Sequence, residues 1–536
     1  MKKTLLPLLL LGIALFSCSI SPTPSTTSLS SDVSSEATSF EPSVESTTEP
    51  SQESRQEPSL ESIPYSEPSV PSQPSSAESV PSSSSASTPG PKYARDPKDE
   101  SLYSKQTYLN YLGDIQSAWD EYRGDGVTLA VIDSGFRYQH PEFQLEDGSS
   151  KVLDTSASFT YSGGKVNVSK GRDKVGITDG DSHGTICATV AAGSITGNGT
   201  VGVAPNCDLM LLKTDKKPKS IVEAFKYAAD NGARVITISI GSYADYVGDL
   251  VNDGSDLASC FNAALKYAHS KGVVICSASG NGGEMGIPTE YTFPGASDYV
   301  IGAGGLASSS RASIWSGSSY NSGKAYQFCD VFAPAQNLYS GCYFDRDGKH
   351  YDYDGGFNGT SFASPIIAGA AALYFQKYPT KTNVDFERAL YRTASPLQGE
   401  KGGYGAIDIA SLLDYEVPED AVKTYYFTDA AWWRADGANT SAFAWNYGQT
   451  AINGDYPGVK MVSVNTSTWS IELDTTLYER LVFVRVSPTN LDWGAETVNI
   501  DLSSFGSKNC YSIASTSAKW KSDGQYVTGT FTTYNA

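Results

Sequence analysis

Residues 127–135 read VTLAVIDSG, an almost unbroken apolar run that stops at an acid and a glycine-containing turn. A short apolar run without alternation is typical of a strand that is buried on both faces of a parallel sheet. Similar runs recur at residues 209–213, 235–240 and 273–277. Between these runs the chain has helical periodicity, at residues 221–230 and 257–270, and a glycine follows each stretch, at 232 and 272. The pattern predicts an α/β domain with three layers around a parallel sheet.

Three short segments carry the residues that could perform chemistry. Asp133 ends the first apolar run, His183 lies in DSHGT at 181–185, and Ser361 lies in GTSFASP at 359–365. A serine hydroxyl is a weak nucleophile that needs a base within hydrogen-bond distance, and the base needs an orienting carboxylate. Because the carboxyl ends of parallel strands meet at one edge of a sheet, we expect such side chains to gather there. The plainer alternatives are that Asp133 only caps an element and that Ser361 only starts a helix.

The chain has four histidines that could supply the base. His140 precedes a proline in a loop, His269 lies on the polar side of a helix, and His350 lies in a charged loop. His183 differs from these because it is expected at a helix start, followed by the small residues Gly184 and Thr185. We therefore select His183 as the base.

The three motifs, in the order Asp, His, Ser, resemble those of the subtilisin-like (S8) serine peptidases. The resemblance covers roughly residues 105–415 and includes GVAP at 202–205, FAP at 332–334 and GYG at 403–405. It implies an endopeptidase with Asp133, His183 and Ser361 as its triad, acting through an acyl-enzyme on Ser361. SASGN at 277–281 matches the family motif whose asparagine stabilises the oxyanion, so the resemblance assigns this role to Asn281. An ordinary turn at Asn281-Gly282 is the alternative.

The resemblance also implies where a substrate binds. An extended peptide would pair with two backbone segments of the chain, Ser239, Ile240 and Gly241 on one side and Ser277, Ala278 and Ser279 on the other. Thr292 matches the position that floors the S1 pocket in the family. A β-branched residue there should narrow the pocket, so we expect a small or medium P1 residue in preference to Phe or Tyr.

Two departures from the family pattern bear on cofactors and folding. The segment between the helix of His183 and Gly202 is short where many subtilisins carry a calcium-binding loop. No cofactor is expected for the chemistry and no metal ligand is assigned, and a structural calcium ion is left open. The residues between about 92 and Gln106 are too few for a folded propeptide.

The N-terminus predicts export and a membrane anchor. Lys2 and Lys3 precede an apolar run at residues 5–16 that is too short to span a bilayer and has the length of a signal-peptide core. The sequence LFSC at 15–18 resembles a bacterial lipobox, which predicts a signal peptide at 1–18 and lipidation of Cys18. Two acyl chains on that cysteine suffice for stable anchoring. Residues 19–92, rich in Ser, Pro, Glu and Thr, predict a disordered stalk at a bacterial cell surface.

Cysteines and net charge narrow the remaining possibilities. Cys329 and Cys342 could pair across a loop, whereas Cys187 and Cys276 lie in apolar stretches and are predicted to be buried. A formal charge of -20 argues against a nucleic-acid partner. We therefore expect protein or peptide substrates within a peptidase domain at residues 93–418.

Residues 419–536 form short alternating stretches with many aromatic residues, which predicts a small all-β sandwich. The segment weakly resembles carbohydrate-binding modules of the starch-binding kind. Tryptophans suit stacking on sugars, and the candidates are Trp432, Trp433, Trp445 and Trp493. The alternative is that these tryptophans pack in the core of the domain. Polysaccharide is thus a second candidate partner.

Two functions of different classes follow. The first is a secreted, lipid-anchored serine endopeptidase that hydrolyses extracellular proteins, or a processing peptidase with very few substrates. The second is a surface adhesin whose peptidase domain no longer catalyses. Degenerate relatives usually lack a triad residue, and Asp133, His183 and Ser361 are all present.

Overall fold

The computed structural model describes residues 93–145, 147–177, 182–243, 257–290, 292–297, 299–321, 328–346, 349–397, 402–416, 418, 421–445, 459–486, 493–514 and 526–535. The predicted signal peptide at 1–18, the lipidation site Cys18 and the stalk at 19–92 lie outside the described residues. So does Asp181 of the DSHGT motif.

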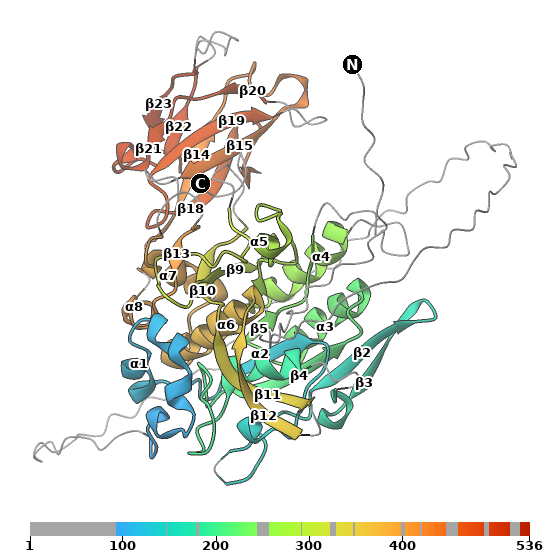
Figure 1. The fold of residues 1–536 in the computed structure, drawn as a ribbon. Helices are drawn as coiled ribbons and strands as arrows, with labels where there is room; N and C mark the ends of the chain where they lie inside the picture. The colour runs from blue at the N-terminus through green and yellow to red at the C-terminus, as the bar shows by residue number, and fades with distance from the viewer. Residues whose placement is uncertain are drawn as a thin grey trace, which may run out of the picture. The chain divides into compact units, whose positions relative to one another are not determined.

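A nine-stranded sheet forms the centre of the peptidase domain (Figure 1). Its strands are β1 (Thr128–Asp133), β2 (Ala157–Ser162), β3 (Lys165–Lys170), β4 (Asp208–Thr214), β5 (Val235–Ile238), β7 (Val274–Ala278), β9 (Ile301–Leu306), β10 (Val331–Pro334) and β13 (Gly405–Ala406). They are ordered β13-β10-β9-β7-β5-β1-β4-β2-β3. All neighbours are parallel except β2 and β3. The predicted parallel sheet is confirmed.

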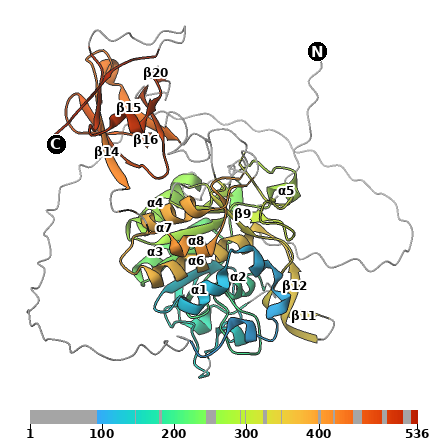
Figure 2. The ribbon, with the colours of Figure 1, turned by 90° about the vertical axis from the view of Figure 1, so that its left-hand side faces the viewer.

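Helices cover both faces of this sheet (Figure 2). One layer contains α3 (Pro218–Asp230) and α4 (Leu257–Ser270). The other contains α1 (Ile115–Glu121), α2 (His183–Ala192), α6 (Thr360–Lys377), α7 (Asn383–Thr393) and α8 (Ile409–Asp414). Along β1, Leu129 and Val131 join the core with α2 and α6, while Ala130 and Ile132 join the core with α3 and α4. Both faces of the strand are buried, which explains the unbroken apolar run and confirms the three-layer prediction.

Smaller elements surround the sheet. A hairpin of β11 (Leu338–Arg346) and β12 (Lys349–Phe357) leads into α6. Strand β6 (Ser242–Tyr243) follows β5 and pairs in antiparallel fashion with β8 (Thr292–Phe293). The short helix α5 (Gly282–Met285) lies between β7 and β8 in the sequence. Single 3-10 turns are η1 (Pro97–Asp99), η2 (Tyr103–Lys105), η3 (Thr107–Tyr111), η4 (Pro141–Phe143) and η5 (Arg172–Lys174).

The C-terminal residues form two sheets over their own core. One sheet has the order β17 (Val462–Ser463), β18 (Thr468–Asp474), β14 (Val422–Thr428), β22 (Cys510–Ser512) and β23 (Thr530–Thr532). The other has β16 (Val459–Lys460), β15 (Asn439–Trp445), β19 (Arg480–Val486) and β20 (Trp493–Glu496), with β21 (Ile500–Asp501) beside β19. The 3-10 turns η7 (Ala435–Gly437) and η8 (Leu502–Phe505) complete the domain. The predicted all-β architecture is confirmed, and the pair β14 and β22 is parallel.

One tryptophan of the predicted glycan-binding set occupies the core of this domain. Trp433 is fully buried, its ring lies 4.9 Å from that of Phe427, and its Nε1 donates a hydrogen bond to Thr440 Oγ1 at 3.0 Å. A buried ring has no face for a sugar, so this candidate was wrong. Trp432 is half-buried against the same core. The side chains of Trp445 and Trp493 lie outside the described residues.

The cysteine expectations are settled for the described residues. Cys187 and Cys276 are buried, as predicted. Cys329 and Cys342 do not pair, since their thiols donate to Ser319 O and Tyr351 O respectively. Among the described residues, we find no helix with the length and apolarity that a bilayer crossing requires.

Candidate active site

Asp133 and His183 form a buried hydrogen-bonded pair where β1 ends and α2 begins. The His183 Nδ1 lies 2.9 Å from both carboxylate oxygens of Asp133. The Asp133 Oδ1 also accepts a hydrogen bond from the Ser134 N–H at 2.7 Å, which fixes the carboxylate. A Cβ at Gly184 would lie 2.5 Å from Gly135 O and 2.9 Å from Asp133 Cβ. Gly184 is therefore the residue that lets the helix approach the strand closely enough for this bond.

The two largest influences on the pKa of His183 oppose each other. Burial disfavours the imidazolium, but the Asp133 carboxylate beside it favours the charged form. The second effect prevails, and the pKa of His183 lies well above its usual value of 6.5. The Asp133 carboxylate therefore stabilises the protonated form of the imidazole.

Ser361 lies in the first turn of α6, beside the first turn of α2. Pro365 has no N–H, so the Ser361 carbonyl lacks the usual helical donor four residues later. Two side chains replace that donor, since the Ser239 hydroxyl donates to Ser361 O at 2.7 Å and the Cys187 thiol at 3.4 Å. Cys187 lies one turn after His183, so these bonds hold the nucleophile candidate against the helix of the base. Within the described part of the chain, the Ser361 Oγ has no hydrogen-bond partner.

Asn281 is oriented by the residue before Ser361. Its Oδ1 accepts hydrogen bonds from the Thr360 N–H at 3.0 Å and the Thr360 hydroxyl at 2.9 Å. The hydroxyl also accepts from the Gly280 N–H at 3.2 Å. With Oδ1 engaged, the amide group of Asn281 presents its Nδ2 as a donor. This geometry suits stabilisation of a developing oxyanion.

The expected substrate-binding segments lie beside these residues. Ser239, Ile240 and Gly241 directly follow β5, while Ser277 and Ala278 end the neighbouring strand β7 and Ser279 follows it. Thr292 in β8 is buried, and its hydroxyl donates to Ser279 O at 3.2 Å. Thr292, which we expect to floor the S1 pocket, therefore contacts the expected substrate-binding segment at Ser279.

The sequence argument did not foresee three side-chain contacts at this site, and it assigned no role to Thr360. Thr360 orients Asn281, and Ser239 and Cys187 bind the Ser361 carbonyl through their side chains. The sequence holds one signal for the last two, because a proline four residues after Ser361 predicts a carbonyl that needs other donors. Nothing in the sequence identifies those donors.

Within the described residues, one group of side chains could ligate a metal ion, and it consists of Asp133, His183 and Cys187. Their donor atoms lie within 4.8 Å of one another. Their proximity already has an explanation, since the His183 Nδ1 is engaged with Asp133 and the Cys187 thiol with Ser361 O. Burial raises the pKa of Cys187, so its thiol is protonated and a weak ligand. The cluster fits an acid-base pair better than a metal centre.

The short loop after α2 is held by three side chains. Glu142 accepts from the Thr200 N–H at 2.6 Å and the Thr200 hydroxyl at 2.8 Å. Glu100 accepts from the N–H groups of Gly197 and Gly199, and the Gln106 side chain pairs with the N–H and C=O of Val201. A calcium ion requires oxygen ligands, whereas this loop directs N–H donors at both carboxylates. The residues of this loop do not fit a calcium ion.

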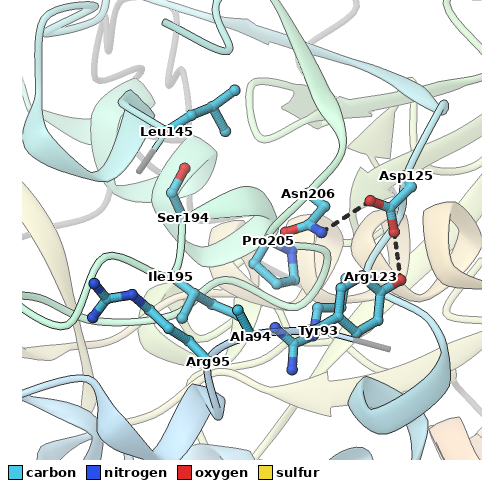
Figure 3. A pocket seen from close by; sticks show the side chains of 10 residues that line it. All are labelled: Tyr93, Ala94, Arg95, Arg123, Asp125, Leu145, Ser194, Ile195, Pro205 and Asn206. Atoms are coloured by element: carbon cyan, nitrogen blue, oxygen red, sulfur yellow. Dashed lines mark hydrogen bonds between the residues drawn. The ribbon is translucent and has the colours of Figure 1, made fainter. Parts of the chain in front are cut away.

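A cavity of about 320 Å³ lies at the opposite edge of the sheet, near the starts of β1 and β4 (Figure 3). Its polar centre is Asp125, which accepts from the Tyr93 hydroxyl at 2.5 Å and the Asn206 amide at 2.9 Å. Gln376 near the end of α6 donates to both Tyr93 and Asp125. These contacts join the N-terminal segment to the far end of α6, so the cavity marks a structural junction distant from the Asp133–His183 pair.

Comparisons with known proteins agree with the geometry. The model of the subtilase family, peptidase S8, matches residues 124–409. Subtilisin DY from Bacillus licheniformis is 31% identical over 290 residues, which are 53% of this chain and 89% of that protein. Subtilisin E from Bacillus subtilis (strain 168) is 30% identical over 289 residues, 53% of this chain and 64% of that protein. The chain thus spans most of the first relative and slightly under two thirds of the second.

Among solved structures, the chain is similar to fervidolysin from Fervidobacterium pennivorans, described as a keratinolytic enzyme related to subtilisin. The TM-score is 0.49 with 19% sequence identity, covering 76% of this chain and 60% of that chain. The family match ends at residue 409, before the C-terminal β domain.

The Glu142 contact generates a stability prediction. Burial raises the pKa of Glu142 from 4.5 to about 8, so the carboxyl is protonated at neutral pH. Glu142→Gln, which imitates that form, should preserve most of the stability. Glu142→Ala leaves the Thr200 donors unsatisfied and should cost about 1–3 kcal/mol. Thermal unfolding of both variants measures the loss of stability. The Ser361→Ala background prevents self-digestion during the measurement.

The same samples test the fit to calcium. Adding calcium or a chelator should shift the melting temperature equally with and without Glu142→Gln. A calcium-dependent gain that disappears in Glu142→Gln would show that a cation binds there. The sign of the pH dependence follows from the raised pKa: stability from protonated Glu142 is complete below about pH 4.5 and is lost as pH rises through about 8.

Proposed function

Because the chain belongs to the subtilase family and is a subtilisin-like serine endopeptidase, we propose that Asp133, His183 and Ser361 are its catalytic triad. The observation that carries the assignment is the bond of 2.9 Å between the His183 Nδ1 and the buried Asp133 carboxylate. Ser361 is held beside the helix of that histidine by Cys187. The triad order along the chain is the one typical of the family.

The proposed mechanism uses side chains and backbone groups of this chain alone. The Ser361 Oγ attacks the scissile carbonyl while the His183 Nε2 takes its proton, and Asp133 stabilises the imidazolium that forms. The Asn281 Nδ2 and the Ser361 N–H donate hydrogen bonds to the oxyanion of the tetrahedral intermediate. The imidazolium then gives its proton to the departing amine, which leaves an acyl-enzyme on Ser361. Water, activated by His183, hydrolyses that ester.

The proposed substrates are extracellular proteins that bind as extended strands. Ser239–Gly241 continue past Ile238, the last residue of β5 that pairs with β7, so this segment can offer its backbone to an extended peptide beside Ser277–Ser279. Buried Thr292 beneath Ser279 supports a P1 residue of small or medium size. No cofactor is proposed for the chemistry.

The adhesin alternative has less support. It requires a peptidase domain that has lost its chemistry, whereas the bond between Asp133 and His183 and the bond that orients Asn281 support a working site. Binding of polysaccharide by the C-terminal domain stays a proposal, and with Trp433 in the core it depends on other surfaces such as that of half-buried Trp432.

The nucleophile assignment predicts the outcome of two assays on one pair of proteins. Residues 93–536 should hydrolyse casein and be labelled by a fluorophosphonate probe, and Ser361→Ala should lose both signals. Ser364→Ala is the matched control, because Ser364 is buried in the same helix and its hydroxyl is engaged with Thr237. Labelling that persists in Ser361→Ala would disprove the assignment. Labelling without casein cleavage in the parent would indicate a narrow processing enzyme.

The Asp133–His183 pair predicts a pH profile. Neutral imidazole is the base, so kcat/KM should rise with pH through a midpoint above 6.5, the usual pKa of histidine. Asp133→Asn removes the negative charge, so kcat should fall roughly 10⁴-fold and the midpoint should move to lower pH. Asp208→Asn, at the other end of the neighbouring strand β4, is the control and should change neither. An unchanged midpoint in Asp133→Asn would contradict the coupling.

The anchor is part of the proposal and concerns residues outside the described range. We expect the full chain, expressed in a bacterium that processes lipoproteins, to incorporate labelled palmitate and to fractionate with membranes. Cys18→Ser should abolish both without affecting the peptidase activity of the released protein. Label that remains after Cys18→Ser would place the lipid on another residue.

A further inference from the structure

The residues around the end of β4 carry a surplus of positive charge. Residues 157–170 and 213–219 contain six lysines and one acid, Asp215, although the whole chain has a formal charge of -20. The first range contains β2 and β3, and the second contains the end of β4 and the start of α3. Because β2 lies between β3 and β4 in the sheet, the two ranges meet at one end of it (Figure 1).

Contacts between the two ranges bring their lysines onto one surface. We define the lysine surface as Lys165, Lys213, Lys216, Lys217 and Lys219. The Lys217 Nζ donates to Tyr161 O at 2.8 Å, and the Lys219 Nζ lies 5.3 Å from the centre of the Tyr161 ring. Asp215 accepts from the Tyr161 N–H at 2.9 Å and lies 3.4 Å from the Lys217 Nζ. Lys165 is exposed, and the Lys217 side chain is 55% exposed.

The lysine surface lies on the same edge of the sheet as the proposed catalytic residues. Asp133, the last residue of β1, is paired in register with Lys213 of β4. On the other side of β1, Ile132 pairs with Ile238, so Ser239 follows at the level of Asp133. Neighbouring strands are about 4.8 Å apart, so about 10 Å separates Ser239 from Lys213 across β1. An extended peptide covers about 10 Å in roughly three residues, so one that leaves Ser239 toward β4 soon reaches the lysine surface.

The charge of the rest of the chain makes this surface stand out electrostatically. Six lysines against one acid give the two ranges a formal charge of +5, so the rest of the chain carries -25. An acidic peptide is therefore repelled by the chain as a whole and attracted where the sign is reversed. At physiological ionic strength such attraction acts over about 8 Å, which confines it to segments that pass close to the lysines.

We propose that the lysine surface binds acidic residues of protein substrates on one flank of the cleaved bond, and so directs the peptidase to acidic segments. The inference rests on the proposed function, since it presumes that a peptide lies beside Ser239–Gly241 and Ser277–Ser279. It adds a charge preference outside the pocket at Thr292. The competing occupant is the stalk at residues 19–92, which contains ten acidic and two basic residues.

The experiment uses the exported chain, residues 19–536, and three peptides that share one cleavage sequence. The first peptide has Gln on both flanks, and each of the others has Glu on one flank, beginning about three residues from the cleaved bond. One Glu peptide should have a kcat/KM about fivefold above that of the Gln peptide, mainly through a lower KM, as expected for a few exposed ion pairs. Sodium chloride at about 0.5 M should remove this gain.

Two variants locate the charges that produce the gain. The test variant combines Lys216→Gln, Lys217→Gln and Lys219→Gln, and its ratio of the Glu value to the Gln value should fall to about one, because the attracting charges are gone. The control variant changes the net charge of the chain by the same amount within the C-terminal domain and should keep the gain. It combines Lys423→Gln, Lys460→Gln and Lys508→Gln.

Several results would overturn the proposal. Equal kcat/KM values for the three peptides, a gain that persists in the test variant, or a gain that the control variant also loses would each do so. A gain that appears only after residues 19–92 are removed would assign the lysine surface to the stalk. If the test variant does not fold, an unchanged gain in Lys165→Gln suffices to reject the proposal. Failure of the proposed function is recognised separately, because the Gln peptide would then stay intact and Ser361 would not react with the fluorophosphonate probe.

Discussion

The close contact between the end of β1 and the start of α2 is the constraint on which the site depends. An ionised carboxylate buried at the end of a strand is costly unless it is well hydrogen-bonded. Here Asp133 accepts from the Ser134 N–H and from His183, and the bond to His183 requires that α2 begin against the strand. Only a residue without Cβ allows this, and Gly184 is that residue. The site is thus built from the contact of two rigid elements, which fixes its geometry.

The same edge of the sheet gathers groups from distant parts of the chain. β5 and β7 deliver Ser239 and Asn281 next to β1, because the strand order places β5 between β1 and β7. On the far side of α2, Glu142, Glu100 and Gln106 hold the loop that returns the chain toward β4. The side-chain oxygens of these three residues accept hydrogen bonds from the N–H groups of the loop and so hold it in place. The helix of the base is supported at both of its ends.

The sequence was sufficient for features that depend on local pattern. The apolar run at 127–132 predicted a strand buried on both faces, and it is such a strand because Leu129 and Ala130 enter different cores. The candidate triad could be identified because each of its residues lies within a short motif that also contains glycine. These residues are Asp133, His183 and Ser361. Features that depend on pairing between distant segments could not be predicted, and the register of Tyr243 opposite Thr292 is one of them. Trp433 was misjudged because alternation identifies a strand domain without telling which aromatic rings lie inside it.

The helix α6, which carries the proposed nucleophile, contains a proline near its start, and this proline affects how Ser361 is held. α6 is buried from Thr360 to Phe375, so it is surrounded by protein and cannot adjust its position freely. Pro365 removes one internal hydrogen bond near its start and leaves the Ser361 carbonyl to Ser239 and Cys187. These two donors come from the segment after β5 and from α2, the elements that border the substrate edge and hold the base. Because the helix leaves the Ser361 carbonyl without its usual donor, that carbonyl can bind Ser239 and Cys187, and these bonds fix the position of Ser361 relative to β5 and α2.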